Sequence, residues 1–222
     1  MKKIITGLFM IGALCLCQNC MAFENVVIEE AAPAETVENS QTKQIAASVT
    51  FDWLDITQAQ RDEQIDKYKN LLFSGSSDKV YYTKDEFKKE FSAFAKDKSY
   101  KHHYMLANNG VTEDEDAKYC AFYYKKNTLV IYAIQYKKNP HNAFYYTAFG
   151  KLYYVDVTSD AYPNFPYYSM QYNRKGQLKS AIYFVSKDIQ YMYGPDKEFQ
   201  GIWYKDKMYN ANGKQTLTRS NW

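Results

Sequence analysis

The sequence has few cysteines, and most of them lie in one short stretch at its start. Of the four cysteines, Cys15, Cys17 and Cys20 lie within the first 20 positions, and only Cys120 lies elsewhere. A chain that loses this stretch keeps one thiol and cannot form an internal disulfide. Small exported domains often depend on disulfides, so we expect burial of side chains alone to stabilise this one. We interpret Cys120 as a small buried hydrophobe rather than a nucleophile, because it lies in an apolar segment.

The sequence also lacks an apolar run long enough for a transmembrane helix. Its longest run, Ile4 to Cys17, has 14 residues, whereas a spanning helix needs roughly 20. This run follows two lysines and precedes the small-residue pattern Cys20-Met21-Ala22, which is typical of a secretory signal peptide. We expect residues 1–22 to be cleaved after Ala22, which leaves an exported chain in the periplasm, on the cell surface or outside the cell. Lipidation of a leader cysteine, which would anchor the chain, is the alternative.

An excess of charge is absent as well. The 28 basic and 25 acidic residues give a net charge of +3, which falls to +1 when Lys2 and Lys3 leave with the leader. A nearly neutral protein has no field to attract phosphate backbones, so we expect no nucleic-acid partner. The sequence contains no glycine-rich phosphate loop, zinc signature or dinucleotide fingerprint, and we expect no cofactor.

The histidines and the main acidic run do not match a metal site. His102 and His103 are adjacent, whereas ligands on one helix face lie three or four residues apart. The run 113–116 lacks the alternating ligands and central glycine of a calcium loop. His141 lies in a turn. We therefore expect no metal site, and we interpret these residues as solvated polar surface.

Composition divides the chain after the leader into a linker and one folded domain. Residues 23–46 contain mostly Glu, Ala, Pro, Thr, Ser and Gln, which cannot bury enough surface to offset the entropy of ordering. We predict a disordered linker there and a single α+β domain over 47–222.

Two capping boxes predict the helices of this domain. Thr57 is followed at the third position by Gln60, and Thr83 by Glu86, so each threonine can cap a helix whose third residue caps it in return. Apolar residues recur at helical spacing after each box. We predict two amphipathic helices over 55–105 whose aromatic stripes need a partner surface.

From Ala117 onward the pattern changes to short aromatic and β-branched segments separated by Gly, Asn, Pro and Lys turns. The connections are too short for helices, so the strands should pair antiparallel. We predict a Tyr-rich antiparallel β-meander of about eight or nine strands over 117–218, with the helices lying across one face. The strands are expected at 119–124, 129–136, 144–147, 152–157, 167–172, 179–185, 189–193, 201–204 and near Leu217.

A degenerate unit recurs within the predicted meander. It consists of a tyrosine, three turn residues, a glycine or lysine, a polar residue and usually an apolar one, at 146–152, 172–178, 193–199 and 209–215. A tight hairpin needs one residue that accepts a positive φ, which explains the glycine. The units at 172–178 and 209–214 resemble YD-type and variant MORN-type hairpin repeats of exported bacterial proteins, and 150–154 more loosely resembles cell-wall-binding repeats. The resemblance covers residues 144–218 at most and implies a β-hairpin architecture.

The 23 tyrosines and 13 phenylalanines are the most unusual feature of the composition. Adjacent aromatic residues in a strand place one ring on each face of a sheet. One hypothesis is an exposed row of rings that stacks on sugars or on an apolar partner surface. The other is cross-strand packing beneath the helices. The residues that we assign to the binding surface are Tyr146, Tyr153, Tyr168, Tyr172, Tyr193, Trp203 and Tyr204.

These observations favour an exported, non-catalytic binding or structural module of the cell envelope or the extracellular space. Its expected partner is an envelope glycan or an envelope protein, and self-association is a further interpretation. The alternative is a hydrolase of envelope polymers that uses two carboxylates as acid and base. The candidates for these carboxylates are Asp156, Asp160 and Asp188.

Overall fold

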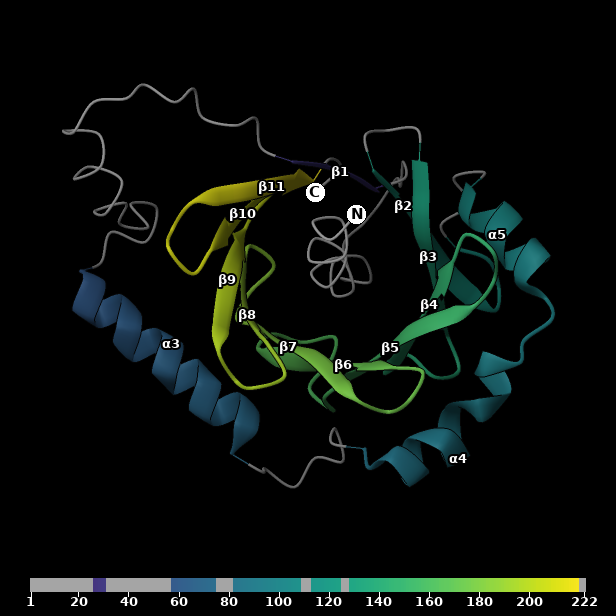
Figure 1. The fold of residues 1–222 in the computed structure, drawn as a ribbon, viewed down its shortest axis with the longest axis horizontal. Coiled ribbons are helices and arrows are strands. Elements are labelled where there is room, and N and C mark those ends of the chain that lie inside the picture. Colours follow the sequence, from purple (N-terminus) through teal and green to yellow (C-terminus); the bar gives the residue numbers. More distant parts are fainter. Residues whose placement is uncertain (1–25, 31–56, 75–81, 109–112, 125–127, 220–222) are drawn as a thin grey trace.

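A computed structural model of the chain describes residues 26–30, 57–74, 82–108, 113–124 and 128–219. Within these ranges, three helices surround a sheet that closes on itself as a barrel (Figure 1). The fold is α+β with a Tyr-rich antiparallel meander, as predicted. The helices are α3 (Gln58–Phe73), α4 (Lys84–Ala95) and α5 (Tyr100–Asn108), and the strands are β1 (Val26–Glu30), β2 (Ala117–Tyr124), β3 (Thr128–Tyr136), β4 (Asn142–Thr147), β5 (Leu152–Thr158), β6 (Tyr167–Asn173), β7 (Leu178–Phe184), β8 (Ile189–Tyr193), β9 (Phe199–Tyr204), β10 (Lys207–Asn210) and β11 (Gln215–Arg219).

Each strand from β2 to β11 pairs antiparallel with the next one along the chain. The sequence analysis missed β10, a four-residue strand between two turns. It also missed β1, which lies within the expected linker, so the prediction of disorder is wrong for these five residues. β1 pairs antiparallel with β11 and parallel with β2, and thereby satisfies the backbone of two strands that would otherwise be edges. The expected leader and residues 31–46 lie outside the described residues.

The helical region contains three helices instead of the predicted two. Both capping boxes are present at the starts of α3 and α4. The second predicted helix is interrupted after Lys96, because Asp97 Oδ1 accepts hydrogen bonds from the backbone N–H (2.7 Å) and the hydroxyl (2.6 Å) of Ser99. Such local bonds compete with the helical ladder. The chain therefore turns before α5 begins.

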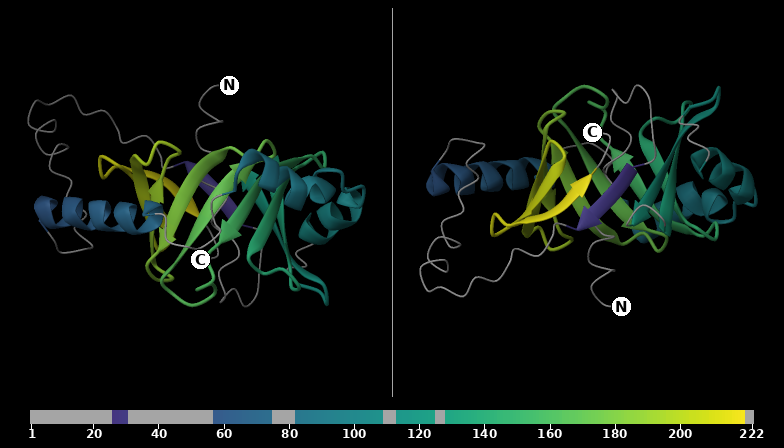
Figure 2. Two further views of the ribbon diagram at one scale, coloured as in Figure 1. Left: turned by 90° about the horizontal axis from the view of Figure 1, so that it is seen from below. Right: turned by 90° about the horizontal axis from the view of Figure 1, so that it is seen from above.

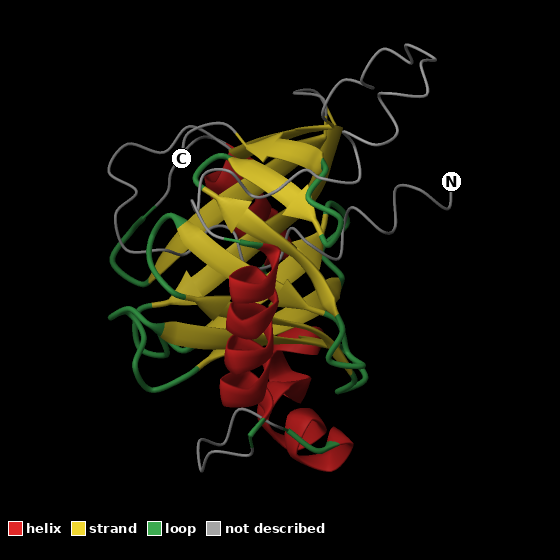
Figure 3. Cartoon of the chain, turned by 90° about the vertical axis from the view of Figure 1, so that its left-hand side faces the viewer, coloured by secondary structure: helices red, strands yellow, loops and turns green. Residues whose placement is uncertain are grey.

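The wall of the barrel has an apolar layer on each side, because successive strand residues point to opposite faces. The helices lie outside the barrel, with α3 along β7 and β8 and with α5 along β2 and β3 (Figures 1, 2 and 3). Their aromatic stripes pack on the outer face: Phe94 stacks on Phe144 with ring centroids 3.9 Å apart, and Tyr68 lies 4.6 Å from Tyr191. The helices thus cover the outer face of the sheet, while the inner face encloses a second core.

The four tyrosine-containing units form four turns with the same hydrogen bonds. In the first, the Thr147 N–H donates to the Lys151 carbonyl (2.9 Å) and the Gly150 N–H donates to the Thr147 carbonyl (2.9 Å). Corresponding bonds join the equivalent residues of the other three turns. The pairing register shifts at the tyrosine of each unit, which indicates a β-bulge. Because these turns follow alternate strands of the meander, all four lie at one end of the barrel. Within these four turns, the residues with positive φ are Gly150 (76°), Gly176 (75°), Lys197 (66°) and Gly213 (77°).

Lys197 occupies the position that glycine fills in the other three turns, which leads to a testable prediction. A non-glycine residue at this φ costs about 1–2 kcal/mol, although the Lys197 ammonium gains a contact 5.3 Å from the Phe73 ring. We expect Lys197→Gly to raise the free energy of unfolding by about 1 kcal/mol. Lys197→Ala keeps the β-carbon and loses the ring contact, so it should not stabilise the protein. Urea unfolding of both variants measures the difference, and a Lys197→Gly protein less stable than Lys197→Ala would contradict the prediction.

Candidate functional site

Four of the seven residues assigned to an exposed aromatic surface are buried. Tyr146, Tyr172, Tyr193 and Trp203 are 0–2% exposed, so they cannot form a stacking surface, and that assignment is wrong for them. The other three, at positions 153, 168 and 204, are half-buried.

Three of the four tyrosines of the turn units, Tyr146, Tyr172 and Tyr193, attach the helical region to the barrel, which explains their burial. The Tyr193 hydroxyl donates to the Ile65 carbonyl in α3 (2.7 Å), and the Tyr146 hydroxyl donates to the Phe94 carbonyl in α4 (3.4 Å). The Tyr172 hydroxyl accepts from a backbone N–H just before α4 (3.3 Å). These rings therefore supply both packing area and a polar end for docking helices.

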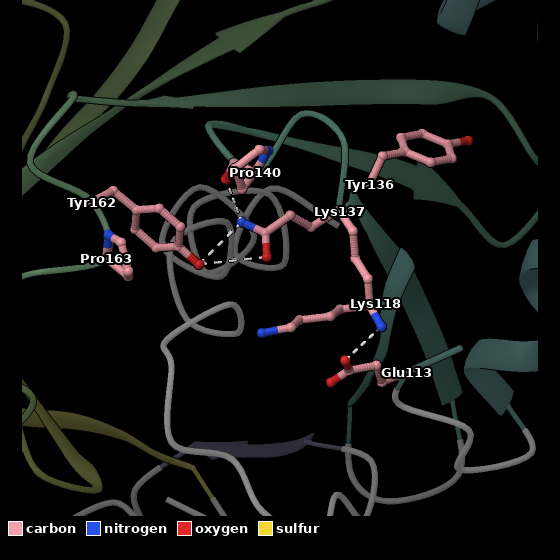
Figure 4. A pocket seen from close by; sticks show the side chains of 8 residues that line it. Glu113, Lys118, Tyr136, Lys137, Pro140, Tyr162 and Pro163 are labelled. Atoms are coloured by element: carbon pink, nitrogen blue, oxygen red, sulfur yellow. Dashed lines mark hydrogen bonds and ion pairs between the residues drawn. The ribbon is translucent and has the colours of Figure 1, made fainter. Parts of the chain in front are cut away.

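A pocket of about 370 Å³ lies at the end of the barrel opposite the four turns (Figure 4). Its walls come from the segment before β2, from β2 and β3, from the turn after β3 and from the loop between β5 and β6. Gln135 joins two of these segments, because its Nε2 donates to the Pro140 carbonyl (2.6 Å) and to the Tyr162 hydroxyl (3.2 Å). The phenol ring of Tyr162 and the ring of Pro163 form an apolar wall beside this amide.

Three charged residues give the pocket a net positive charge. Lys137 Nζ pairs with Glu113 Oε1 at 2.7 Å, and this lysine lowers the pKa of the glutamate, which is thus ionised at neutral pH. Lys118 extends across the pocket from β2 (Figure 4). Among the residues that the structure describes, no ion pair involves Lys118. Its ammonium group is therefore available to an anion that enters the pocket.

The three carboxylates of the hydrolase alternative lie outside the lining of this pocket. Asp156 points into the barrel, where its Oδ1 accepts a hydrogen bond from Gln171 Nε2 (2.8 Å). Burial raises the pKa of Asp156 to about 8, against the opposing effect of its hydrogen bonds. Asp160 is exposed in the loop after β5, and Asp188 is half-buried in the turn after β7.

The histidine and acidic segments have structural roles that the sequence did not reveal. His103 is 7% exposed, which corrects the expectation of solvated surface, and its ring packs near Tyr119 and Tyr136. Burial lowers the pKa of His103. Asp114 accepts hydrogen bonds from the N–H of Ala117 (2.8 Å) and from the hydroxyl of Tyr119 (2.9 Å). In the described part of the chain, no group of three His, Cys, Asp or Glu residues could hold a metal ion.

Cys120 is buried in the barrel interior, as predicted. The sequence analysis did not identify Lys118, Gln135 or Tyr162 as site residues. Gln135 carried a usable signal, since it is the one polar side chain between apolar residues near the end of a predicted strand. Lys118 and Tyr162 carried none.

The fold and this site define the class of protein as an antiparallel meander that β1 closes into a barrel, with external helices and a cationic pocket at one end. No family model matches the chain, and searches of curated proteins and of solved structures found no match. None of the helices in the described ranges has the length and apolar character needed to cross a membrane.

Proposed function

We propose that this protein is an exported, non-catalytic module that binds an anionic glycan of the cell envelope in the pocket at the end of the barrel. The observation that carries the proposal is the Lys118 side chain, which extends into the pocket beside the apolar wall of Tyr162 and Pro163. Export is the expectation from the leader sequence at residues 1–22.

The chemistry of the pocket suits an acidic sugar. An ammonium group pairs with a carboxylate through a charge-assisted hydrogen bond, and the flat side chains beside it can pack on the apolar face of a sugar ring. The Gln135 amide adds polar atoms between these groups. The volume of about 370 Å³ lies near the lower end of the range for ligand pockets, which favours the end of a polymer or a short fragment over an internal stretch.

Binding without hydrolysis is supported by the state of Glu113, which is the only acidic residue among the described residues that line the pocket. Hydrolysis of a glycosidic bond generally uses two carboxyl groups, one of them a general acid with a raised pKa. The pKa of Glu113 is instead lowered by Lys137. A carboxylate held ionised in an ion pair is poorly suited to donate a proton to a leaving group.

Removal of the Lys118 charge tests the proposal. We expect Lys118→Ala to weaken binding to insoluble peptidoglycan or to a soluble polyuronate by at least about tenfold, because a charge-assisted hydrogen bond contributes roughly 1.5–3 kcal/mol. Co-sedimentation and calorimetry measure the affinities. The matched control is Lys151→Ala, which removes an exposed lysine at the opposite end of the barrel and should bind like the wild type.

Two outcomes would overturn the proposal. One is wild-type protein that binds neither probe, and the other is equal affinity of Lys118→Ala and Lys151→Ala. Export is checked separately, since protein recovered from outside the cytoplasm should begin at Phe23.

A further inference from the structure

Inside the barrel, the side-chain amide of Gln190 is enclosed but makes no hydrogen bond to the described part of the chain. Gln190 is 0% exposed, and neither its side-chain oxygen nor its side-chain nitrogen has a hydrogen-bond partner among the residues that the structure describes. The next residue, Tyr191, packs outward against Tyr68 of α3, so the alternation of β8 directs Gln190 into the interior. An enclosed polar group without a partner removes a large fraction of the stability of a domain. The amide therefore points to a ligand.

Trp203 adds its indole nitrogen to the two polar atoms of the Gln190 amide. It is the Cα partner of Gln190 across β8 and β9 and is 1% exposed, and no residue within the described ranges forms a hydrogen bond with its indole nitrogen. The guanidinium group of Arg219 lies 4.4 Å from the centre of the Trp203 ring, and its Nη2 donates to the Lys205 carbonyl (2.8 Å). Two adjacent strands thus present a carbonyl oxygen, an amide N–H₂ and an indole N–H to the interior.

The surroundings of this polar group are apolar. Phe184 and Met208 are the Cα partners of Gln190 and Trp203 on the outer sides of the strand pair, and both belong to the interior core. Contacts between aromatic rings link this group to the pocket at the end of the barrel. The ring centroid of Tyr167 lies 5.1 Å from that of Tyr162, which lines the pocket, and 4.5 Å from that of Phe184, on which it stacks. The polar atoms therefore lie in the half of the barrel that adjoins the pocket.

We propose that the interior between β8 and β9 is a second binding site, for a neutral molecule that carries a secondary amide. The amide oxygen of such a ligand accepts from the Trp203 indole or the Gln190 N–H₂, and its N–H donates to the Gln190 oxygen. The acyl methyl group packs against Met208 and Phe184. An N-acetylated sugar has this chemistry, and the site does not depend on Lys118.

The test uses the full-length chain labelled with ¹⁵N, with N-acetylglucosamine and glucose as probes. We expect N-acetylglucosamine, but not glucose, to shift the indole N–H resonance of Trp203, which a Trp203→Phe variant assigns. Gln190→Met keeps the size of the side chain without its amide, and it should weaken the binding of N-acetylglucosamine by about tenfold or more. Circular dichroism shows whether this variant is folded.

The same titration can overturn the inference. No shift of the Trp203 indole with either sugar, measured on wild-type protein, would mean that the interior does not bind this class of ligand. An equal response to both sugars would remove the role of the amide. Loss of the response in Lys118→Ala would assign binding to the end pocket, whereas an unchanged response in that variant keeps this site separate from the proposed glycan function.

Discussion

Asp156→Asn is expected to flatten the dependence of stability on pH between about pH 4 and pH 8, and to raise the free energy of unfolding at pH 9 by several kcal/mol. The cause is the position of Asp156 inside the barrel, where burial raises the pKa of its carboxyl group from 3.8 to about 8. Asparagine keeps an oxygen that can accept the hydrogen bond from Gln171. Asparagine carries no charge at any pH, so its burial has no cost that depends on pH.

The sign of this pH dependence follows from the protons that Asp156 binds in the folded and in the unfolded state. Between pH 3.8 and about pH 8 the folded protein keeps the proton on Asp156, whereas the unfolded chain releases it. The contribution of this group to stability is therefore fully present below about pH 4, decreases as the pH rises and is lost above about pH 8. Within this window, each rise of one pH unit lowers the free energy of unfolding by about 1.4 kcal/mol.

Urea unfolding of the wild type and Asp156→Asn from pH 4 to pH 9 measures the effect. The control is Asp160→Asn, which removes an exposed carboxylate four residues away and should leave the pH dependence of the wild type unchanged. Parallel stability curves for the wild type and Asp156→Asn would show that Asp156 is ionised in the folded state.

Gly150→Ala is expected to destabilise the protein by at least about 3 kcal/mol. A β-carbon at Gly150 would lie 2.2 Å from Tyr100 Cγ and 2.5 Å from Tyr100 Cβ, and φ at this glycine is +76°. Tyr100 is the first residue of α5, so relief of the clash requires movement of that helix or of the turn. Thermal and urea unfolding measure the loss.

Gly176 is a matched control that separates the clash with Tyr100 from the cost of a non-glycine residue at positive φ. Gly176 has φ +75° in the equivalent turn, but a β-carbon there would lie 3.0 Å from Phe87 Cβ, a contact that a small shift relieves. We expect Gly176→Ala to cost less than Gly150→Ala. In a Tyr100→Gly background, which removes both the Cγ and the Cβ of Tyr100, Gly150→Ala should lose most of its excess cost. Equal losses for the two glycine variants, with no rescue by Tyr100→Gly, would mean that contact with α5 does not matter.

Local chemistry accounts for the parts of the fold that the sequence predicted. The capping boxes at Thr57 and Thr83 each involve residues three positions apart, and both form. The turns around Gly150, Gly176 and Gly213 need a positive φ that glycine accepts without strain. Nearly every strand of the meander was predicted as well, because the alternation of side chains between the two faces of a strand depends only on consecutive residues.

Features that depend on contacts distant in sequence could not be predicted. The pairing of β1 with β2 and β11 joins the two ends of the described chain. The composition around β1 predicted a disordered linker, and nothing in the sequence of this segment specifies these neighbours. The hydroxyls of Tyr146, Tyr172 and Tyr193 bond to residues of the helical region that lie 52, 90 and 128 positions earlier in the sequence. An aromatic strand residue alone therefore does not reveal whether its ring is exposed.

The candidate site, like the fold, combines features set by neighbouring residues with features that depend on contacts distant in sequence. The sequence by itself determined that the protein is an α+β domain with an antiparallel meander, because helix caps, tight turns and strand alternation are set by neighbouring residues. Only the tertiary structure decided that Lys118, Gln135 and Tyr162 meet at one pocket and that Gln190 and Trp203 face the interior. The physical reason is that closure of the barrel brings side chains from separate strands together, and the identity of each residue carries no information about that closure.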